Sequence, residues 1–169
     1  MTNDPKVTGP CVGNSIRCAV QVMEDHPNYR TKIVTMRTPV GMHAQAMVEK
    51  REGQWEWLQL QRTLFSYGKA VVGKMEFPGS PILNVQNVRD FVISHSNQFP
   101  RDRYTEVDRS DPVKDQKRFR KLLEEVLGPL EDFLTTVGES EAMQNPELKK
   151  IMIWGGDVKK ALGLKLRGF

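Results

Sequence analysis

Hydrophobic residues recur at helical spacing directly after a short polar start to the chain. Over residues 10–24 the apolar positions fall on one face of a helix: Val12, Ile16, Ala19, Val20 and Met23. Pro10 suits the first helical position, and Pro27 disfavours helical geometry in the residue before it. The pattern therefore predicts a helix over about residues 10–24, preceded by a flexible lead-in over residues 1–8.

Strand patterns follow the helix. Residues 32–36 are rich in β-branched side chains, and residues 38–41 form a turn. Apolar and polar residues then alternate over 42–49, which places His43 on the face opposite Ala44. The pattern continues with a hairpin connection at 50–53, a returning strand at 54–61 and two further strands at 63–67 and 70–77. Together these segments predict an antiparallel sheet.

Helical periodicity returns after Pro81. Apolar residues and His95 are spaced for a helix of about ten residues that includes Phe91. Ser110-Asp111-Pro112 supplies an N-cap and a first-position proline for a helix that continues to Leu127. The rest of the pattern predicts a kink or stop at Gly128-Pro129, a short helix ending at Gly138, a polar linker over 139–145, a helix over 146–154 that Gly155-Gly156 ends, and a last turn or two from Asp157.

The predicted elements describe an α+β protein, with an N-terminal helix packed on an antiparallel sheet and a C-terminal helical extension. We divide the chain into the lead-in over 1–8, a core over 9–105, a helical segment over 106–138 that packs on or near the core, and a linker with a basic helical arm over 139–169. At 169 residues the chain can bury a core of ordinary size without disulfides or metal.

Composition narrows the classes of protein. The mean hydropathy is −0.50, and we find neither an apolar run long enough for a membrane span nor the core of a signal peptide. We therefore expect a cytoplasmic protein with no membrane partner. Cys11 and Cys18 lie seven residues apart, ~10 Å along one helix, too far for a disulfide. The two cysteines and three scattered histidines lack zinc-ligand spacing, so we expect no metal and no cofactor.

Positive charge gathers towards the C-terminus. The chain carries a formal net charge of +4, and the segment from Pro146 onwards contains six basic and two acidic residues. Apolar and aromatic residues interleave with these bases, so this arm is a candidate surface for a protein or nucleic-acid partner. Its candidate binding residues are Lys149, Lys150, Trp154, Lys159, Lys160, Lys165 and Arg167. No recognised nucleic-acid motif favours the second kind of partner.

One set of residues has the order that thiol chemistry needs. Cys11 falls in the first turn of the predicted helix, where unpaired N–H groups and the positive end of the helix dipole favour a thiolate. Cys18 falls at the edge of the apolar stripe and reads as a buried filler. His43 begins a strand and could take the proton of the thiol, and a polar side chain on the outward face of the next strand could orient the imidazole. Backbone N–H groups around Cys11 could hold an oxyanion.

The segments Gly9-Pro10-Cys11, Arg30-Thr31-Lys32-Ile33-Val34, His43-Ala44, Val48-Glu49 and Gly53-Gln54-Trp55 resemble the transglutaminase-like branch of the papain-like cysteine proteases. The resemblance covers about residues 9–61. It implies a papain-like core, a nucleophilic Cys11, a base at His43 and a peptide or protein substrate. Gln59 occupies the position of the family's Asp, with Gln61 as the alternative orienter. A glutamine can orient an imidazole but lacks the charge that stabilises an imidazolium.

Two functional hypotheses follow. The first is amide hydrolysis or acyl transfer through a thioester on Cys11, with His43 as the general base. The second is a catalytically degenerate papain-like fold that serves as an interaction or assembly protein through its basic C-terminal arm. Plainer interpretations remain for each residue: Cys11 as a half-buried cysteine, His43 as a surface histidine and Trp55 as cover for a sheet face.

Overall fold

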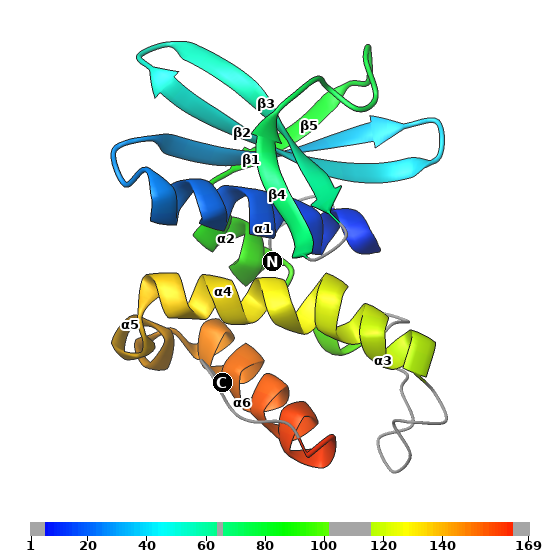
Figure 1. Ribbon diagram of the computed structural model, residues 1–169, viewed down its shortest axis with the longest axis vertical. Helices are drawn as coiled ribbons and strands as arrows, with labels where there is room; N and C mark the ends of the chain where they lie inside the picture. The colour runs from blue at the N-terminus through cyan, green and yellow to red at the C-terminus, as the bar shows by residue number, and fades with distance from the viewer. Residues whose placement is uncertain (1–5, 64–65, 102–115, 164–169) are drawn as a thin grey trace.

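Helix α1 (Pro10–Asp25) packs against a five-stranded antiparallel sheet, as Figure 1 shows. The computed structural model describes residues 6–63, 66–101 and 116–163. The strands are β1 (Arg30–Thr38), β2 (Gly41–Arg51), β3 (Gln54–Thr63), β4 (Ser66–Val72) and β5 (Ile82–Gln86). Their order across the sheet is β4-β3-β2-β1-β5. The predicted α+β class, with its N-terminal helix on an antiparallel sheet and its C-terminal helices, is thereby confirmed.

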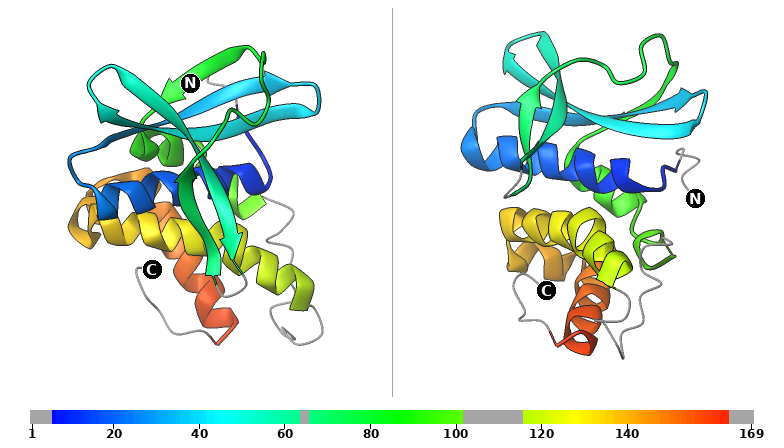
Figure 2. Two further views of the ribbon diagram at one scale, coloured as in Figure 1. Left: turned by 45° about the horizontal axis from the view of Figure 1, so that its top comes forward. Right: turned by 45° about the vertical axis from the view of Figure 1, so that its right-hand side comes forward.

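Strand β3 pairs with two different neighbours along its length. Its first half pairs with β2, and the last matched pair is Met47 with Trp57. Its second half pairs with β4, starting at Leu58 opposite Val72. The β3–β4 hairpin therefore turns away from the first half of β2 and crosses α1, which contacts both β2 and β4 (Figures 1 and 2). The divergence of β2 from β3 opens a space above α1.

The second half of the sheet differs from the sequence pattern. Strand β3 continues to Thr63 and β4 already begins at Ser66, so the described residues of the segment 63–67 belong to these two strands and not to a separate one. Strand β4 ends at Val72, and the chain then leaves the ladder over residues 73–77. The pattern after Pro81 predicts a helix and no strand, but residues 82–86 form β5 at the edge of the sheet beside β1. This strand depends on pairing with a segment some fifty residues earlier, which local periodicity does not report.

The helices also differ in detail. Helix α2 (Val88–Ser94) is present as predicted, with Asn87 as its N-cap. Helix α3 (Gln116–Leu122) continues through a π-helical turn (Leu123–Leu127) into α4 (Gly128–Val137), so Gly128-Pro129 does not stop the helix. The predicted N-cap at residues 110–112 lies outside the described residues. A helix, α5 (Glu139–Gln144), replaces the expected polar linker, and α6 (Pro146–Ala161) runs through Gly155-Gly156 without a break.

The hydrophobic core extends from the sheet into the C-terminal helices. Helix α1 lies between the sheet and α4, and α6 lies on the far side of α4 (Figures 1 and 2). The fully buried residues Ile16, Ile33, Phe133 and Ile151 come from α1, β1, α4 and α6 and belong to one cluster. Among the described residues, none of the helices has the length and hydrophobicity needed to cross a bilayer.

Candidate active site

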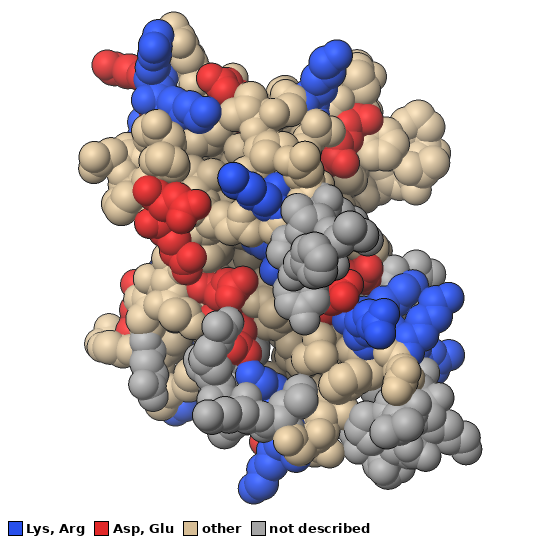
Figure 3. Space-filling model, viewed as in Figure 1, with Lys and Arg blue, Asp and Glu red and all other residues tan. Residues whose placement is uncertain are grey.

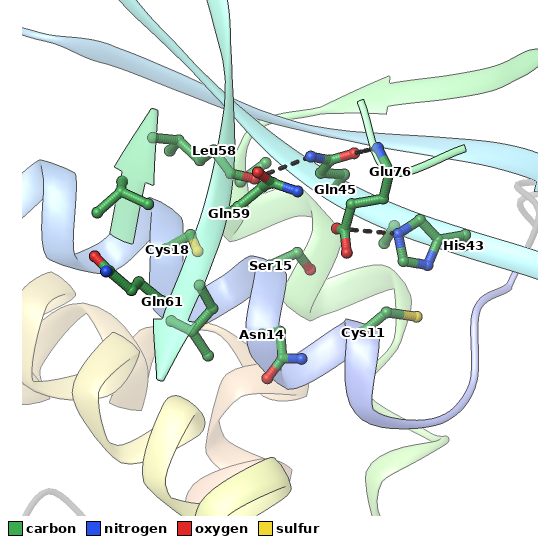
Figure 4. Close-up of a pocket in the computed structure, with 14 residues that line it drawn as sticks. Cys11, Asn14, Ser15, Cys18, His43, Gln45, Leu58, Gln59, Gln61 and Glu76 are labelled. Atoms are coloured by element: carbon green, nitrogen blue, oxygen red, sulfur yellow. Dashed lines mark hydrogen bonds and ion pairs between the residues drawn. The ribbon is translucent and has the colours of Figure 1, made fainter. Parts of the chain in front are cut away.

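The space between β2 and β3 is a pocket of about 480 Å³ whose floor is α1. Polar side chains from four different segments meet in it (Figure 4). They include Cys11 and Asn14 from α1, His43 from β2, Gln59 and Gln61 from β3, and Glu76 from the segment after β4. The structure therefore brings Cys11, His43, Gln59 and Gln61, which the sequence places far apart, to one site.

Cys11 lies in the first turn of α1 and is partly buried. Gly9, with φ of +92°, turns the chain into the helix, and Pro10 has no N–H to satisfy. No side chain caps this helix end and no acidic residue lies in its first turn. The positive end of the helix dipole is therefore not neutralised by α1 itself and acts on the Cys11 sulfur.

His43 lies beside Cys11, and its side chain is 14% exposed. Its Nε2 is 3.3 Å from Oε1 of Glu76, and its ring meets the edge of Phe77. Burial lowers the pKa of His43, but hydrogen bonds with Cys11 and Glu76 and the charges of both groups raise it to about 9. At neutral pH the imidazole is then protonated, which stabilises a neighbouring thiolate.

Glu76 is held in place by Gln45. Oε1 of Gln45 accepts the backbone N–H of Glu76 at 2.9 Å, while its Nε2 donates to the carbonyls of Lys74 and Leu58 at 2.8 and 3.1 Å. Gln45 is 2% exposed, although its place in the alternation puts it on the polar face with His43. The segment over 73–77 covers this face, so Gln45 links β2, β3 and the carboxylate that faces His43.

Gln59 does not contact His43 through any hydrogen bond among the described residues. Its Oε1 accepts the backbone N–H of Lys74 at 3.2 Å. Gln61 also lines the pocket, and its side chain makes no hydrogen bond within the part of the chain that the structure describes. The acid at His43 is Glu76, which sequence reasoning missed because the alternation over 70–77 marked it only as one more strand residue. The orienting role of Gln59 stays a prediction.

Cys18 lies deeper in the same pocket and is 3% exposed, which confirms that it is buried. Burial, with the charge of Glu76 adding to it and that of Arg17 opposing it, raises the pKa of the Cys18 thiol to about 12. Both cysteines are free. The two thiols therefore differ sharply in surroundings, since only Cys11 has an imidazole partner.

The residues predicted for the basic arm are spread over α6. Lys149, Lys150 and Lys160 are exposed, whereas Lys159 is 6% exposed and its Nζ lies 2.5 Å from Oε2 of Glu131 on α4. Trp154 is partly buried against the core. Lys165 and Arg167 lie outside the described residues. On the face shown in Figure 3, the largest group of basic side chains lies instead over α3, at Lys117, Arg118, Arg120 and Lys121.

Comparison of this chain with protein-family models, with curated proteins and with solved structures returned no match. A thiol at a helix start, a protonated imidazole and a carboxylate in that order are the groups that thiol-dependent acyl chemistry uses as nucleophile, proton donor and anionic partner.

Proposed function

We propose that this pocket carries out acyl chemistry on an amide, either hydrolysis or transfer, through a thioester on Cys11. The observation that supports the proposal most directly is the position of His43, with Cys11 on one side of its ring and Glu76 at 3.3 Å from its Nε2 (Figure 4). Glu76 also supplies the negative charge that a glutamine lacks, so the substitution of Gln59 for the family's Asp does not leave the imidazolium without an anionic partner.

In the proposed reaction the Cys11 thiolate attacks the carbonyl carbon of the amide. The new S–C bond forms as the π electron pair moves onto the carbonyl oxygen, which N–H groups at the start of α1 would stabilise. The tetrahedral intermediate collapses when the C–N bond breaks and protonated His43 gives its proton to the leaving nitrogen. Water or an amine then attacks the thioester while neutral His43 takes the proton, and the thiolate of Cys11 is released.

We further infer that α1 and the sheet form a papain-like core of the transglutaminase-like kind. Three features support this inference: the helix that carries Cys11 in its first turn, the histidine near the start of β2, and the tryptophan Trp55 on β3. The departure lies in the carboxylate, since Glu76 comes from the segment after β4 and not from β3 itself.

Selective alkylation tests the proposal. With limiting iodoacetamide at neutral pH, we expect rapid modification of Cys11 and very slow modification of Cys18, because only Cys11 has an imidazole beside it. His43→Ala should slow the labelling of Cys11 strongly and leave that of Cys18 unchanged. Peptide mapping by mass spectrometry gives both rates in one sample, and Cys18→Ala serves as the control. Equal, slow labelling of the two cysteines would rule out a nucleophilic Cys11.

The second candidate function is the binding of a protein or nucleic-acid partner through the basic C-terminal helix. The observation in its favour is the set of exposed lysines on α6, Lys149, Lys150 and Lys160. Because Leu148 and Ile151 of the same helix are buried in the core, removing the helix would disturb the fold. Reversing the charges of Lys149 and Lys150 to Glu is the cleaner test. The double variant is then titrated with salt in the presence of RNA or of an acidic protein. If binding survives the double change, the α6 surface is not the binding site.

A further inference from the structure

Helix α3 carries the densest group of basic side chains among the described residues. Its exposed and half-buried cations are Lys117, Arg118, Arg120 and Lys121. All four lie within one half of the helix circumference, because residues three and four positions apart cover neighbouring parts of a helix surface. Figure 3 shows them as one basic area at the side of the molecule. We call this surface, formed by the four cations, the α3 basic face.

Part of this charge is not neutralised by neighbouring carboxylates. Neither Lys117 nor Arg120 forms an ion pair with any residue that the structure describes. The next acidic residues of the helix, Glu124 and Glu125, lie beyond the basic face in the π-helical turn. Basic residues elsewhere do pair with a carboxylate: Arg30 with Glu49, Arg89 with Glu141, and Lys150 with Glu147. The α3 basic face therefore keeps a positive potential that attracts anions.

The apolar residues of α3 indicate which kind of anion fits. A protein interface has a centre of apolar or aromatic side chains, and a helix that binds a membrane inserts apolar side chains into it. The apolar side chains of α3 do not serve this purpose, since Phe119 packs against the core and Leu122 is fully buried. Interfaces with nucleic acid are more polar and more positively charged than those between proteins. The α3 basic face thus fits a phosphodiester backbone better than an acidic protein or a lipid surface.

The same side chains determine how a nucleic acid would be bound. Lysine and arginine contact phosphate oxygens, and such contacts fix the position of the backbone without reading its sequence. Surfaces that bind single strands also stack bases on aromatic side chains. The one aromatic residue of α3, Phe119, packs against the core and is not available for stacking. The helix is therefore suited to the backbone of a duplex.

We propose that the α3 basic face binds the phosphate backbone of double-stranded nucleic acid without sequence preference. The inference does not depend on the acyl chemistry at Cys11, and it concerns a surface other than the lysines of α6. The cations lie on a helix that is anchored to the core, because Nη2 of the buried Arg17 donates to the carbonyl of Glu124 at 2.8 Å. A partner therefore meets a preformed surface, which reduces the ordering cost of binding.

Fluorescence anisotropy with labelled DNA and RNA duplexes of mixed sequence, titrated from about 20 to 200 mM salt, tests this inference. The logarithm of the binding constant should fall with the logarithm of the salt concentration, with a slope of about −0.9 for each phosphate contacted. Four contacts give a slope of about −3.6. Replacing two cations, Lys117→Gln with Arg120→Gln, should reduce the magnitude of the slope by about 2 and weaken binding at the lowest salt by at least about tenfold. A duplex of shuffled sequence should bind as the first one does.

The matched control is Lys149→Gln with Lys150→Gln, which removes the same charge from exposed residues of α6. It should bind duplexes as the wild type does, and both double variants should keep the fold because they change exposed side chains. An equal loss in the two variants would show that net charge alone drives binding, and this result overturns the proposal. So would unchanged binding in the α3 variant, or no binding of the wild type to either duplex at the lowest salt.

Two further probes separate the alternative partners. Tighter binding to polyglutamate would indicate an acidic protein as the partner, and tighter binding to phosphatidylserine vesicles would indicate a membrane; either result overturns the proposal. Alkylation of Cys11 should proceed in the α3 variant as in the wild type. Failure of duplex binding is thereby distinguished from failure of the proposed thiol chemistry.

Discussion

Replacing Glu76 with Gln tests the electrostatics of the site most directly. The substitution keeps the size of the side chain and its backbone bond to Gln45, but removes the negative charge 3.3 Å from His43 Nε2. The difference between the ordinary pKa of 6.5 and the value of about 9 for His43 corresponds to roughly 3 kcal/mol in favour of the protonated ring. Cys11 contributes the largest part of the increase and Glu76 the next. We therefore expect the pKa of His43 in Glu76→Gln to fall part of the way towards 6.5.

The same change alters stability as a function of pH. Because the pKa of His43 is higher in the folded state than in the unfolded chain, protonation of His43 stabilises the fold. This contribution is fully present below pH 6.5 and is lost as the pH rises through about 9. In the wild type it amounts to at most about 3 kcal/mol. Glu76→Gln should lose less stability over this pH interval, because a smaller rise in the pKa of His43 means that its protonation stabilises the fold less.

Two measurements check this reasoning. Imidazole resonances followed by NMR, assigned with His43→Ala, give the pKa of His43 directly, and urea unfolding below pH 6.5 and above pH 9 gives the change in the free energy of unfolding. Glu52→Gln, which removes the same charge from the exposed β2–β3 connection, is the control. A His43 pKa that is identical in Glu76→Gln and the wild type would refute the role of Glu76.

Three other substitutions test the framework around the site. Gln45→Leu should destabilise the protein by about 1–3 kcal/mol for each backbone group left without a partner, and it should lower the pKa of His43. Urea unfolding measures the first effect and NMR the second, and Gln61→Leu is the matched control. Lys159→Met removes the cation that lies 2.5 Å from Oε2 of the buried Glu131, so thermal or urea unfolding should show a loss of up to about 3–5 kcal/mol. Lys160→Met on the exposed side should change little. Gly13→Ala places a Cβ 2.0 Å from the backbone oxygen of Glu125. We expect it to lower the free energy of unfolding by about 1–3 kcal/mol, because α1 is pushed away from the π-helical turn. An unchanged free energy of unfolding in any of these three variants would contradict the contacts described.

The N-terminal half of the fold could be predicted from the sequence because its signals are local. The stripe that includes Ile16 and Val20 identifies α1, and the alternation from Met42 identifies β2. Cys11 and His43 could be paired because both begin an element and both elements were recognised. Glu76 could not be found in this way. Its position depends on where the chain leaves β4 and on the contacts of Gln45, and neither feature leaves a periodic pattern of apolar residues in the sequence.

In the C-terminal half, contacts between distant segments decide the secondary structure. Gly155 and Gly156 weaken the helical pattern, yet α6 continues through them because Leu148, Ile151 and Val158 are buried on one side. Tertiary burial there outweighs local propensity. Residues 82–86 become a strand because β1 offers a free edge. Both cases depend on a surface supplied by a distant part of the chain.

The divergence of β3 from β2 has a consequence for how the protein moves. Among the described residues no ladder of backbone hydrogen bonds joins β2 to the second half of β3, and side-chain bonds link the two walls instead: those of Gln45 and the contact of His43 with Glu76. The carboxamide of Gln21 also holds β4 to α1 through two hydrogen bonds. A wider opening of the cleft would therefore break side-chain bonds without changing the register of the strands. The breadth of ligand that the cleft admits is then governed by a few polar side chains and not by the whole sheet.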